Sequence, residues 1–235
     1  MRPTTDFVSH LEQWLTTGDT LLVCQDVDLN VNDFIELVSK ISLRVTPSRQ
    51  GLFSQVSYEA DRDNALAESG LTALHTDGLY CTQIPDYGLL YCVDVGKQSI
   101  PTVFLDSSQI VAELRARGTL RTLEQLVGVY GNESGQVTHD IVGVHPRTKK
   151  PILQLGASGL TENVTVKTPS ALGRKEISES LGVVYSLLET AECRVHRWTR
   201  GDVVVFDNHR MLHARGQGTR DKERRLLRIW MSRRS

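Results

Sequence analysis

Residues 202–207 have the sequence Asp202-Val203-Val204-Val205-Phe206-Asp207. Three β-branched valines followed by an aromatic ring suit a pleated, half-buried surface, so the run predicts a β-strand. His213 follows this run closely in the chain. A strand in this position can carry His213 alongside a distant segment, and the run therefore indicates where one half of a functional site forms.

Seven further short apolar runs are separated by turn residues in the same way. They are 88–93, 102–105, 127–130, 141–144, 151–155, 164–166 and 226–231. Eight such runs predict the two opposed sheets of a jelly roll (double-stranded β-helix) in a mainly β fold with flanking helices. A fold of this kind can gather side chains from separate strands at one open end.

Apolar residues at the spacing of an amphipathic helix predict helices over about 6–16, 32–42 and 174–189. A shorter helical pair is expected between residues 108 and 127, and 21–24 has the composition of a further strand. We expect the first two helices to pack on the outside of a sheet and none of the helices to carry chemistry.

The tripeptide His75-Thr76-Asp77 is the strongest functional signal in the chain. In an extended segment residues i and i+2 point the same way, so His75 and Asp77 can face one metal ion while Thr76 faces away. Two imidazoles and one carboxylate leave open positions on the metal, as in non-haem Fe(II) oxygenases. Alone, the tripeptide also fits a surface turn. His213, 136 residues after Asp77, and the arginine at position 224 favour a mononuclear iron site.

Three segments resemble the taurine dioxygenase and clavaminate synthase-like family of Fe(II)- and 2-oxoglutarate-dependent dioxygenases. They are Leu74-His75-Thr76-Asp77-Gly78, the segment 201–215 that ends in Met211-Leu212-His213-Ala214-Arg215, and Arg224-Arg225-Leu226-Leu227-Arg228. The resemblance extends over residues 70–110 and 195–230. Between these parts the chain is shorter than the better-known family members.

The resemblance implies that His75, Asp77 and His213 are the iron ligands. Arg224, eleven residues after His213, falls where a family arginine pairs with the distal carboxylate of 2-oxoglutarate. A planar guanidinium suits that task because it makes two parallel charge-assisted hydrogen bonds. Thr102, 25 residues after Asp77, matches a family threonine whose hydroxyl touches the same carboxylate.

Two further positions match the family less directly. Arg228 matches a second arginine near the acid group of the co-substrate or the substrate. The pair His145-Pro146 resembles a family landmark that is usually structural, so His145 is not counted as a ligand. His139 stands beside Asp140, and adjacent residues of a strand point to opposite faces and cannot share a metal ion. His209 precedes His213 by four residues, a helical ligand spacing that the β-rich context disfavours.

The resemblance also implies the cofactors and the reaction. Fe(II) is the expected metal, 2-oxoglutarate the co-substrate and dioxygen the oxidant, and the expected reaction is oxidation of a C–H bond, most simply hydroxylation. Related halogenating enzymes replace the acidic ligand with a small residue, so Asp77 disfavours halogenation. We expect a small polar or amino-acid-like substrate, as in specialised metabolism, in a pocket lined by residues 50–59 and 78–81.

The composition, with 40% hydrophobic residues, fits one large domain over residues 1–235. No stretch approaches the ~18 apolar residues of a membrane span, and the first residues have no signal-like apolar region. We therefore expect a cytoplasmic protein without a membrane partner. Four cysteines, none of them in a metal-binding or disulfide pattern, fit free thiols.

The formal net charge of -1 argues against non-specific binding to nucleic acid, so a small-molecule substrate is the expected partner. Residues 210–234 nevertheless contain nine Lys or Arg residues against Asp221 and Glu223. Blocks of charge are most often solvated surface. This block would also attract 2-oxoglutarate, which is a dianion.

Two other classes of protein remain open. A cupin-like metalloenzyme would keep the jelly roll and the metal without using 2-oxoglutarate, and Arg224 would then be a surface cation. A metal-free binding module would use its basic C-terminal face, and His75 and His213 would then be dispensable. The ordered combination of H-x-D, Thr102, a distal histidine and Arg224 favours the dioxygenase over both.

Overall fold

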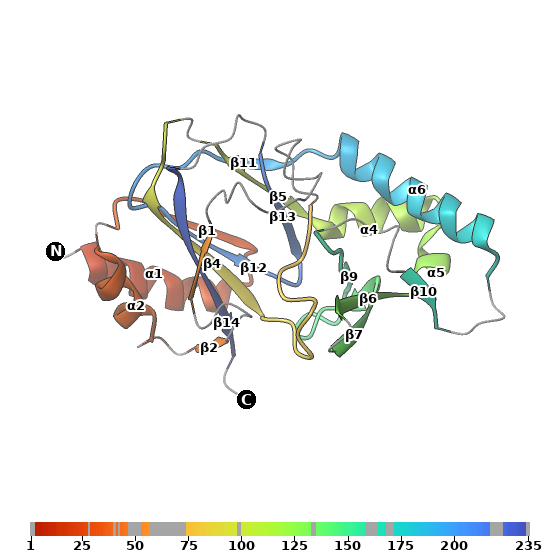
Figure 1. The fold of residues 1–235 in the computed structure, drawn as a ribbon, viewed down its shortest axis with the longest axis horizontal. Helices are drawn as coiled ribbons and strands as arrows, with labels where there is room; N and C mark the ends of the chain where they lie inside the picture. Colours follow the sequence, from red (N-terminus) through yellow and green to blue (C-terminus); the bar gives the residue numbers. More distant parts are fainter. Residues whose placement is uncertain are drawn as a thin grey trace.

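The computed structural model describes residues 3–27, 29–39, 41, 43–46, 53–56, 74–97, 100–132, 135–157, 164–167, 172–216 and 223–233. Its largest element is a six-stranded sheet in which every paired neighbour is antiparallel (Figure 1). The strand order is β1 (Leu21–Cys24), β12 (Val203–Asp207), β4 (Tyr87–Asp94), β14 (Arg225–Ser232) and β2 (Arg44–Thr46), with β3 (Phe53–Val56) also paired with β14.

The run of valines in β12 lies in the middle of this sheet and alternates between its two faces, as the period of a strand requires. Val203 and Val205 pack into an apolar cluster with α1 (Pro3–Thr17) and α2 (Val31–Ser39), which cover one face of the sheet. Val204 and Phe206 point the other way. This second face is the one that meets the functional residues.

A smaller antiparallel sheet lies opposite that second face and has the order β11 (Arg194–His196), β5 (Thr102–Asp106) and β13 (Met211–Arg215). Phe104 of β5 and Met211 of β13 share one apolar cluster with Val204 and Phe206 of β12. Two sheets therefore enclose a core, as predicted for a jelly roll. The strand pairing among the described residues does not close either sheet into a barrel.

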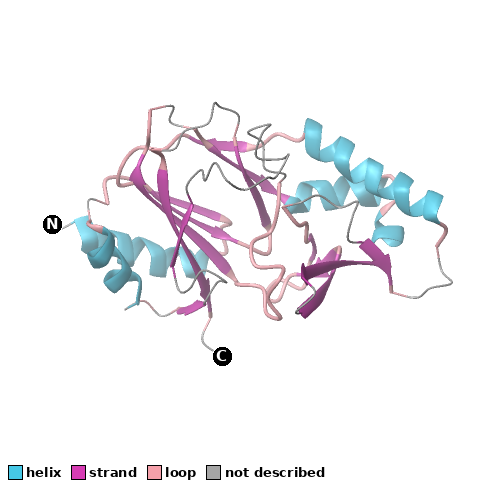
Figure 2. Cartoon of the chain, in the orientation of Figure 1, coloured by secondary structure: helices cyan, strands magenta, loops and turns pink. Residues whose placement is uncertain are grey.

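The other end of the molecule holds the remaining helices and small sheets (Figure 2). Here α4 (Ser107–Ala116), α5 (Leu120–Leu123) and α6 (Arg174–Thr190) pack with Leu105 and Leu212 from the smaller sheet in a third apolar cluster. The strands at this end are β6 (Leu126–Asn132), β7 (Gly135–Asp140), β8 (Val142–Val144), β9 (Pro151–Leu153) and β10 (Val164–Val166). None of the helices that the structure describes is long and apolar enough to cross a membrane.

The predicted mainly β fold with flanking helices is confirmed, and the helices expected near residues 6–16, 32–42 and 174–189 are present. Strands β2, β3, β7 and β11 were not predicted, and the segment of His213 forms a strand of its own, β13, which is not among the predicted runs. No disulfide bond joins any of the four cysteines in the structure.

Candidate metal and co-substrate site

Strand β14 supplies one wall of the candidate site through its period of two. Leu227, Ile229 and Met231 pack on the helix-covered face of the large sheet. Leu226 packs between the two sheets instead. Arg228 and Trp230 follow Leu226 at steps of two, so they project on the same side, toward the smaller sheet.

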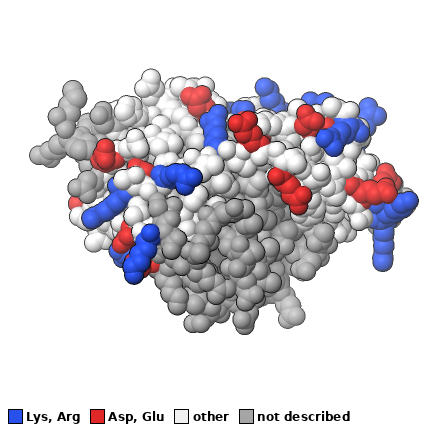
Figure 3. Space-filling model, turned by 90° about the horizontal axis from the view of Figure 1, so that it is seen from above, with Lys and Arg blue, Asp and Glu red and all other residues white. Residues whose placement is uncertain are grey.

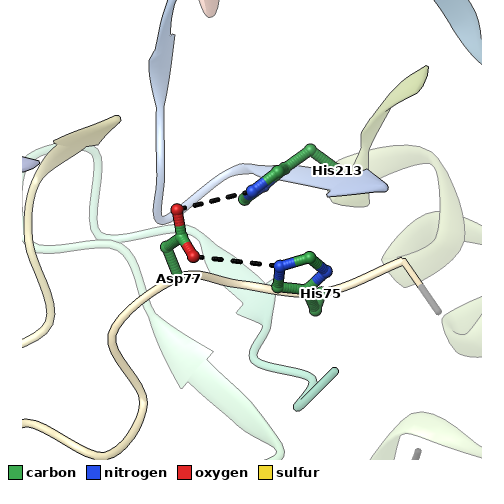
Figure 4. A group of neighbouring side chains, drawn as sticks. All are labelled: His75, Asp77 and His213. Atoms are coloured by element: carbon green, nitrogen blue, oxygen red, sulfur yellow. Dashed lines mark ion pairs between the residues drawn. The ribbon is translucent and has the colours of Figure 1, made fainter. Parts of the chain in front are cut away.

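His75, Asp77 and His213, which we call the triad, converge from two segments (Figure 4). His75 Nε2 lies 3.8 Å from Asp77 Oδ1, and His213 Nε2 lies 3.5 Å from Asp77 Oδ2. One ligand atom from each residue lies within 4.8 Å of the others. Among the residues that the structure describes, this is the one group of metal-ligating side chains with such spacing.

Main-chain hydrogen bonds hold the triad in place. The His75 N–H donates to the His213 carbonyl and the His213 N–H donates to the His75 carbonyl, both at 3.0 Å. Asn208, in the turn between β12 and β13, accepts from the Asp77 N–H and donates to the Asp77 carbonyl, each at 3.0 Å. A third bond, from Asn208 to the Pro85 carbonyl, fixes the amide group itself.

The Asp77 carboxylate is buried and receives two side-chain donors from β14. Arg228 Nη1 donates to Oδ1 at 2.8 Å, and Trp230 Nε1 donates to Oδ2 at 3.0 Å. Burial alone would raise the pKa of Asp77, but the Arg228 guanidinium, followed by His213 and His75, outweighs it and holds the pKa well below its usual range. The carboxylate is therefore ionised at neutral pH, the form that binds a metal ion.

This donor set fits a divalent iron ion. Two imidazoles and one ionised carboxylate grouped on one side match the 2-His-1-carboxylate arrangement that leaves other coordination positions open. The His213 ring is braced by Phe206, whose ring centroid lies 4.6 Å away and which is fully buried. Packing of this kind restricts the orientation of the imidazole.

Thr102 and Arg224, which the resemblance assigns to the co-substrate, are in contact with each other. Arg224 Nη2 donates to Thr102 Oγ1 at 3.1 Å, and both side chains are buried. Trp198 Nε1 donates to the same hydroxyl oxygen at 2.9 Å. Strand β5 carries Thr102, and its register places Phe104 opposite His213. A buried guanidinium beside a hydroxyl is a fitting receptor for a carboxylate.

Arg228, which we expected near an acid group, contacts the triad directly. Its Nε donates to Ser54 Oγ at 3.1 Å while its Nη1 binds Asp77. A guanidinium has five N–H donors, so these two bonds do not exhaust its capacity. Its role toward a co-substrate or substrate stays a prediction.

His145 is structural, as expected from its context. Its Nδ1 accepts from the main-chain N–H groups of Arg147 and Thr148, both at 3.1 Å, so its Nε2 carries the proton that is donated to Asp207 Oδ2 at 2.8 Å.

Asp207 Oδ1 accepts from the His209 N–H at the start of the turn. Asp207 therefore binds His145, and Asn208 binds the Asp77 main chain.

His139 and His209, which the sequence disfavours as ligands, lie outside the triad and have other partners. His139 contacts the Cys81 carbonyl and His209 pairs with Asp86, and His196 pairs with Asp202. Of the expected pocket walls, 78–81 is described, whereas residues 50–52 and 57–59 lie outside the described residues.

Sequence reasoning missed Trp198, Trp230 and Ser54 as members of this site. Trp230 had a readable signal, since it follows Arg228 by two residues and shares its face of a strand. The contacts of Trp198 and Ser54 join residues 96 and 174 positions apart in the chain and depend on the fold.

A comparison with protein families finds that residues 5–230 match the family described as "Taurine catabolism dioxygenase TauD, TfdA family". Among curated proteins, the chain is similar to the tyrosine isonitrile desaturase of Erwinia amylovora, with 28% identity over 194 residues, which are 76% of this chain and 65% of that protein. It is also similar to the 3-((Z)-2-isocyanoethenyl)-1H-indole synthase of Fischerella ambigua, with 23% identity over 181 residues, 71% of this chain and 65% of that protein. The matched part is thus less than two thirds of each relative.

Solved structures share the fold. PvcB, described as an Fe, alpha-ketoglutarate dependent oxygenase from an isonitrile synthetic pathway, superposes with a TM-score of 0.73 at 21% identity, over 96% of this chain and 79% of PvcB. A taurine dioxygenase from Burkholderia xenovorans gives 0.70 at 17% identity, over 96% and 80% of the two chains.

Proposed function

The chain belongs to the taurine catabolism dioxygenase TauD, TfdA family, and on this premise we propose that it is an Fe(II)- and 2-oxoglutarate-dependent oxygenase that oxidises a C–H bond of a small amino-acid-like substrate. One observation carries the proposal. Two histidine nitrogens and an ionised, buried carboxylate form a cluster with spacing suited to one metal ion, and a buried arginine contacts a buried threonine of β5, the strand paired with that of His213.

In this proposal the triad holds the metal, while Arg224 and Thr102 bind the distal carboxylate of 2-oxoglutarate. Bound Fe(II), together with 2-oxoglutarate and dioxygen, supplies the oxidising chemistry. The residues of the chain orient the reactants and exclude water. The buried aromatic rings of Phe104 and Phe206, which pack against each other and against His213, keep this side of the site dry.

The substrate class follows from the relatives and from Arg228. The named relatives act on, or make, isonitriles with a tyrosine or an indole framework. We propose an isonitrile derived from an aromatic amino acid as substrate, and hydroxylation or desaturation as the outcome. Arg228, which is 21% exposed at the edge of the triad, is the proposed contact for the substrate carboxylate.

The test is an anaerobic titration of the metal-free protein with Fe(II) and 2-oxoglutarate, monitored in the visible region. We expect the weak charge-transfer band of iron chelated by the keto acid, and a much weaker response in Arg224→Ala. Iron binding without the band would favour a cupin-like metalloenzyme. Absence of iron binding would contradict the proposal as a whole.

The metal-free binding module relies on a strongly basic C-terminal face. Several of the arginines concerned have acidic partners instead: Arg210 pairs with Asp106, and Arg225 with Asp94. On the face shown in Figure 3, acidic and basic side chains of the described residues are interspersed. These pairings favour the enzyme.

A further inference from the structure

The hydroxyl oxygen of Thr102 accepts hydrogen bonds from two side chains. A threonine hydroxyl offers one O–H donor and two acceptor lone pairs. Trp198 Nε1 donates to this oxygen at 2.9 Å and Arg224 Nη2 donates to it at 3.1 Å. With two N–H groups pointing at the oxygen, both lone pairs are used, and the only hydrogen bond that Thr102 can still make is one that it donates.

No acceptor for that proton is found among the described residues, although Thr102 is only 4% exposed. The proton of a buried hydroxyl is costly to leave without a partner. A carboxylate, which only accepts hydrogen bonds, would satisfy it. The hydroxyl is thus oriented to donate its proton to an anion, even in the absence of a ligand.

Trp198 is placed by the smaller sheet for this contact. It follows β11 by two residues, and the last residue of β11, His196, is the register partner of Thr102 on β5. The indole is 3% exposed and its ring is packed edge-on against the His196 ring, with centroids 4.4 Å apart. Its N–H direction is therefore fixed by packing.

We propose that Trp198 is a positioning residue for the co-substrate: its indole N–H turns the Thr102 hydroxyl into an oriented donor for the carboxylate that Arg224 binds. The inference rests on the proposed function, because it needs 2-oxoglutarate as the ligand. It adds a residue that never contacts the co-substrate and acts through Thr102.

Three tryptophans provide a matched set of variants, since these are all that the chain contains. Trp14 is buried among α1, α2 and the large sheet, and its Nε1 has no hydrogen-bond partner among the described residues. Trp14→Phe therefore removes indole volume without removing a hydrogen bond. Trp198→Phe removes the same volume and the bond to Thr102.

The measurement is the dissociation constant of 2-oxoglutarate for the protein saturated with Mn(II), by anaerobic calorimetry, with Mn(II) affinity measured separately. We expect Trp198→Phe to raise the 2-oxoglutarate constant by about fivefold, the equivalent of one net hydrogen bond, without changing Mn(II) affinity. Trp14→Phe should change neither constant. Equal losses in the two variants would mean that the effect is one of packing, and would overturn the inference.

A double-mutant cycle tests whether the effect runs through Thr102. Thr102→Val removes the hydroxyl and keeps the shape. In that background Trp198→Phe should cost nothing further, whereas the same fivefold loss in both backgrounds would overturn the inference. If Trp198→Phe does not fold, benzothienylalanine at position 198, which keeps the shape of the indole and lacks the N–H, takes its place.

The outcomes separate the inference from the proposed function. If the wild-type protein binds Mn(II) but not 2-oxoglutarate, the proposed function and the inference about Trp198 are both contradicted. If the wild type binds 2-oxoglutarate and Trp198→Phe binds it equally well, only the inference is contradicted.

Discussion

His75 and His213 are joined through their main chains by two reciprocal hydrogen bonds of 3.0 Å, which form an isolated antiparallel bridge. Their imidazole rings lie side by side as a result, with centroids 4.4 Å apart. This bridge adds one pair of residues to the edge of the smaller sheet, next to β13. The two histidines are therefore placed by the main chain, and neither depends on the other's side chain for its position.

This independence makes the triad testable by side-chain deletion. We expect His75→Ala to lower metal affinity by more than about a hundredfold. Mutation of a residue that only hydrogen-bonds to a metal ligand already lowers metal affinity by about 10- to 100-fold, and loss of the ligand itself should have a larger effect. Iron-dependent turnover of 2-oxoglutarate should be abolished and the melting temperature without metal should be nearly unchanged. His10→Ala, on the exposed side of α1, is the control. Retained turnover in His75→Ala would remove its assignment as a ligand.

Arg224→Ala should raise the concentration of 2-oxoglutarate needed for half-saturation by about 10- to 100-fold, because a charge-assisted contact contributes about 1.5–3 kcal/mol. The neighbouring Arg225 is 49% exposed and pairs with Asp94 on the sheet surface. Arg225→Ala should leave the requirement unchanged. The reverse pattern, measured by the same titration, would transfer the role to Arg225.

Trp230→Phe should weaken metal binding by about tenfold, since it removes one N–H donor from the ionised Asp77 carboxylate and lets that carboxylate move. At saturating metal the affinity for 2-oxoglutarate should be retained. This is the opposite of the pattern expected for Trp198→Phe. Calorimetry with Mn(II) distinguishes the two variants, and equal metal affinity in Trp230→Phe and wild type would contradict a role for the indole.

Asp106 predicts a pH dependence of stability. It receives hydrogen bonds from Arg210 Nε at 2.9 Å and Nη2 at 2.6 Å, and it caps α4 through the Ser108 N–H. Burial alone would raise the pKa of Asp106, but the bonds from Arg210 and Ser108 outweigh it and hold the pKa below its ordinary value of 3.8. A lowered pKa means that the carboxylate stabilises the folded state above the pKa of the unfolded chain, and that this contribution is lost as pH falls through the folded pKa.

We therefore expect Asp106→Asn to lower the free energy of unfolding by about 1–2 kcal/mol at pH 7, after allowance for the exposure of Arg210. The difference from the wild type should shrink as pH falls below about 4. Urea unfolding at a series of pH values measures this. Asp140→Asn, which breaks an exposed pair with Lys167, should cost less than about 1 kcal/mol, and a pH-independent loss in Asp106→Asn would contradict the electrostatic explanation.

Gly88 predicts an effect of packing. It faces Phe206 across β4 and β12, and a Cβ atom there would overlap the Phe206 ring. Gly88→Ala should destabilise the protein by about 1–3 kcal/mol. Gly182 lies exposed in α6 with open space around it, so Gly182→Ala should stabilise by about 0.5–1 kcal/mol. Thermal unfolding compares the two, and equal melting temperatures would show that the Phe206 ring can give way.

Patterns with a strong apolar period were read correctly from the sequence. The strands over 21–24 and 164–166 and the start of α6 at Arg174 agree with the structure. Strand β7 was missed because none of its residues is buried, so its sequence shows no apolar alternation, and its pairing with β6 defines it. Strand β11 was missed for the same reason, because its residues Arg194 and Val195 are exposed and show no apolar alternation.

In the candidate site too, local patterns could be predicted and long-range contacts could not. The pair His75 and Asp77 could be predicted because the i, i+2 spacing on an extended segment is a local property, and only His213 comes from a distant part of the chain. The contact of Trp198 with Thr102 could not be predicted, because it joins residues 96 positions apart and depends on the packing of the smaller sheet. Trp230 shares a strand face with Arg228, which the sequence shows, but its partner Asp77 lies 153 residues away and is set by the fold.

The position of Asp77 between the two sheets has one more consequence. Its carboxylate lies against His213 of the smaller sheet and takes donors from Arg228 and Trp230 of the larger sheet. A metal ion bound by the triad would hold the segment of His75 and Asp77 to β13, and the hydrogen bonds from β14 to Asp77 would connect this unit to the larger sheet. Metal binding would therefore support the contact between two layers that the described strands do not join into a closed barrel, in addition to its part in the reaction.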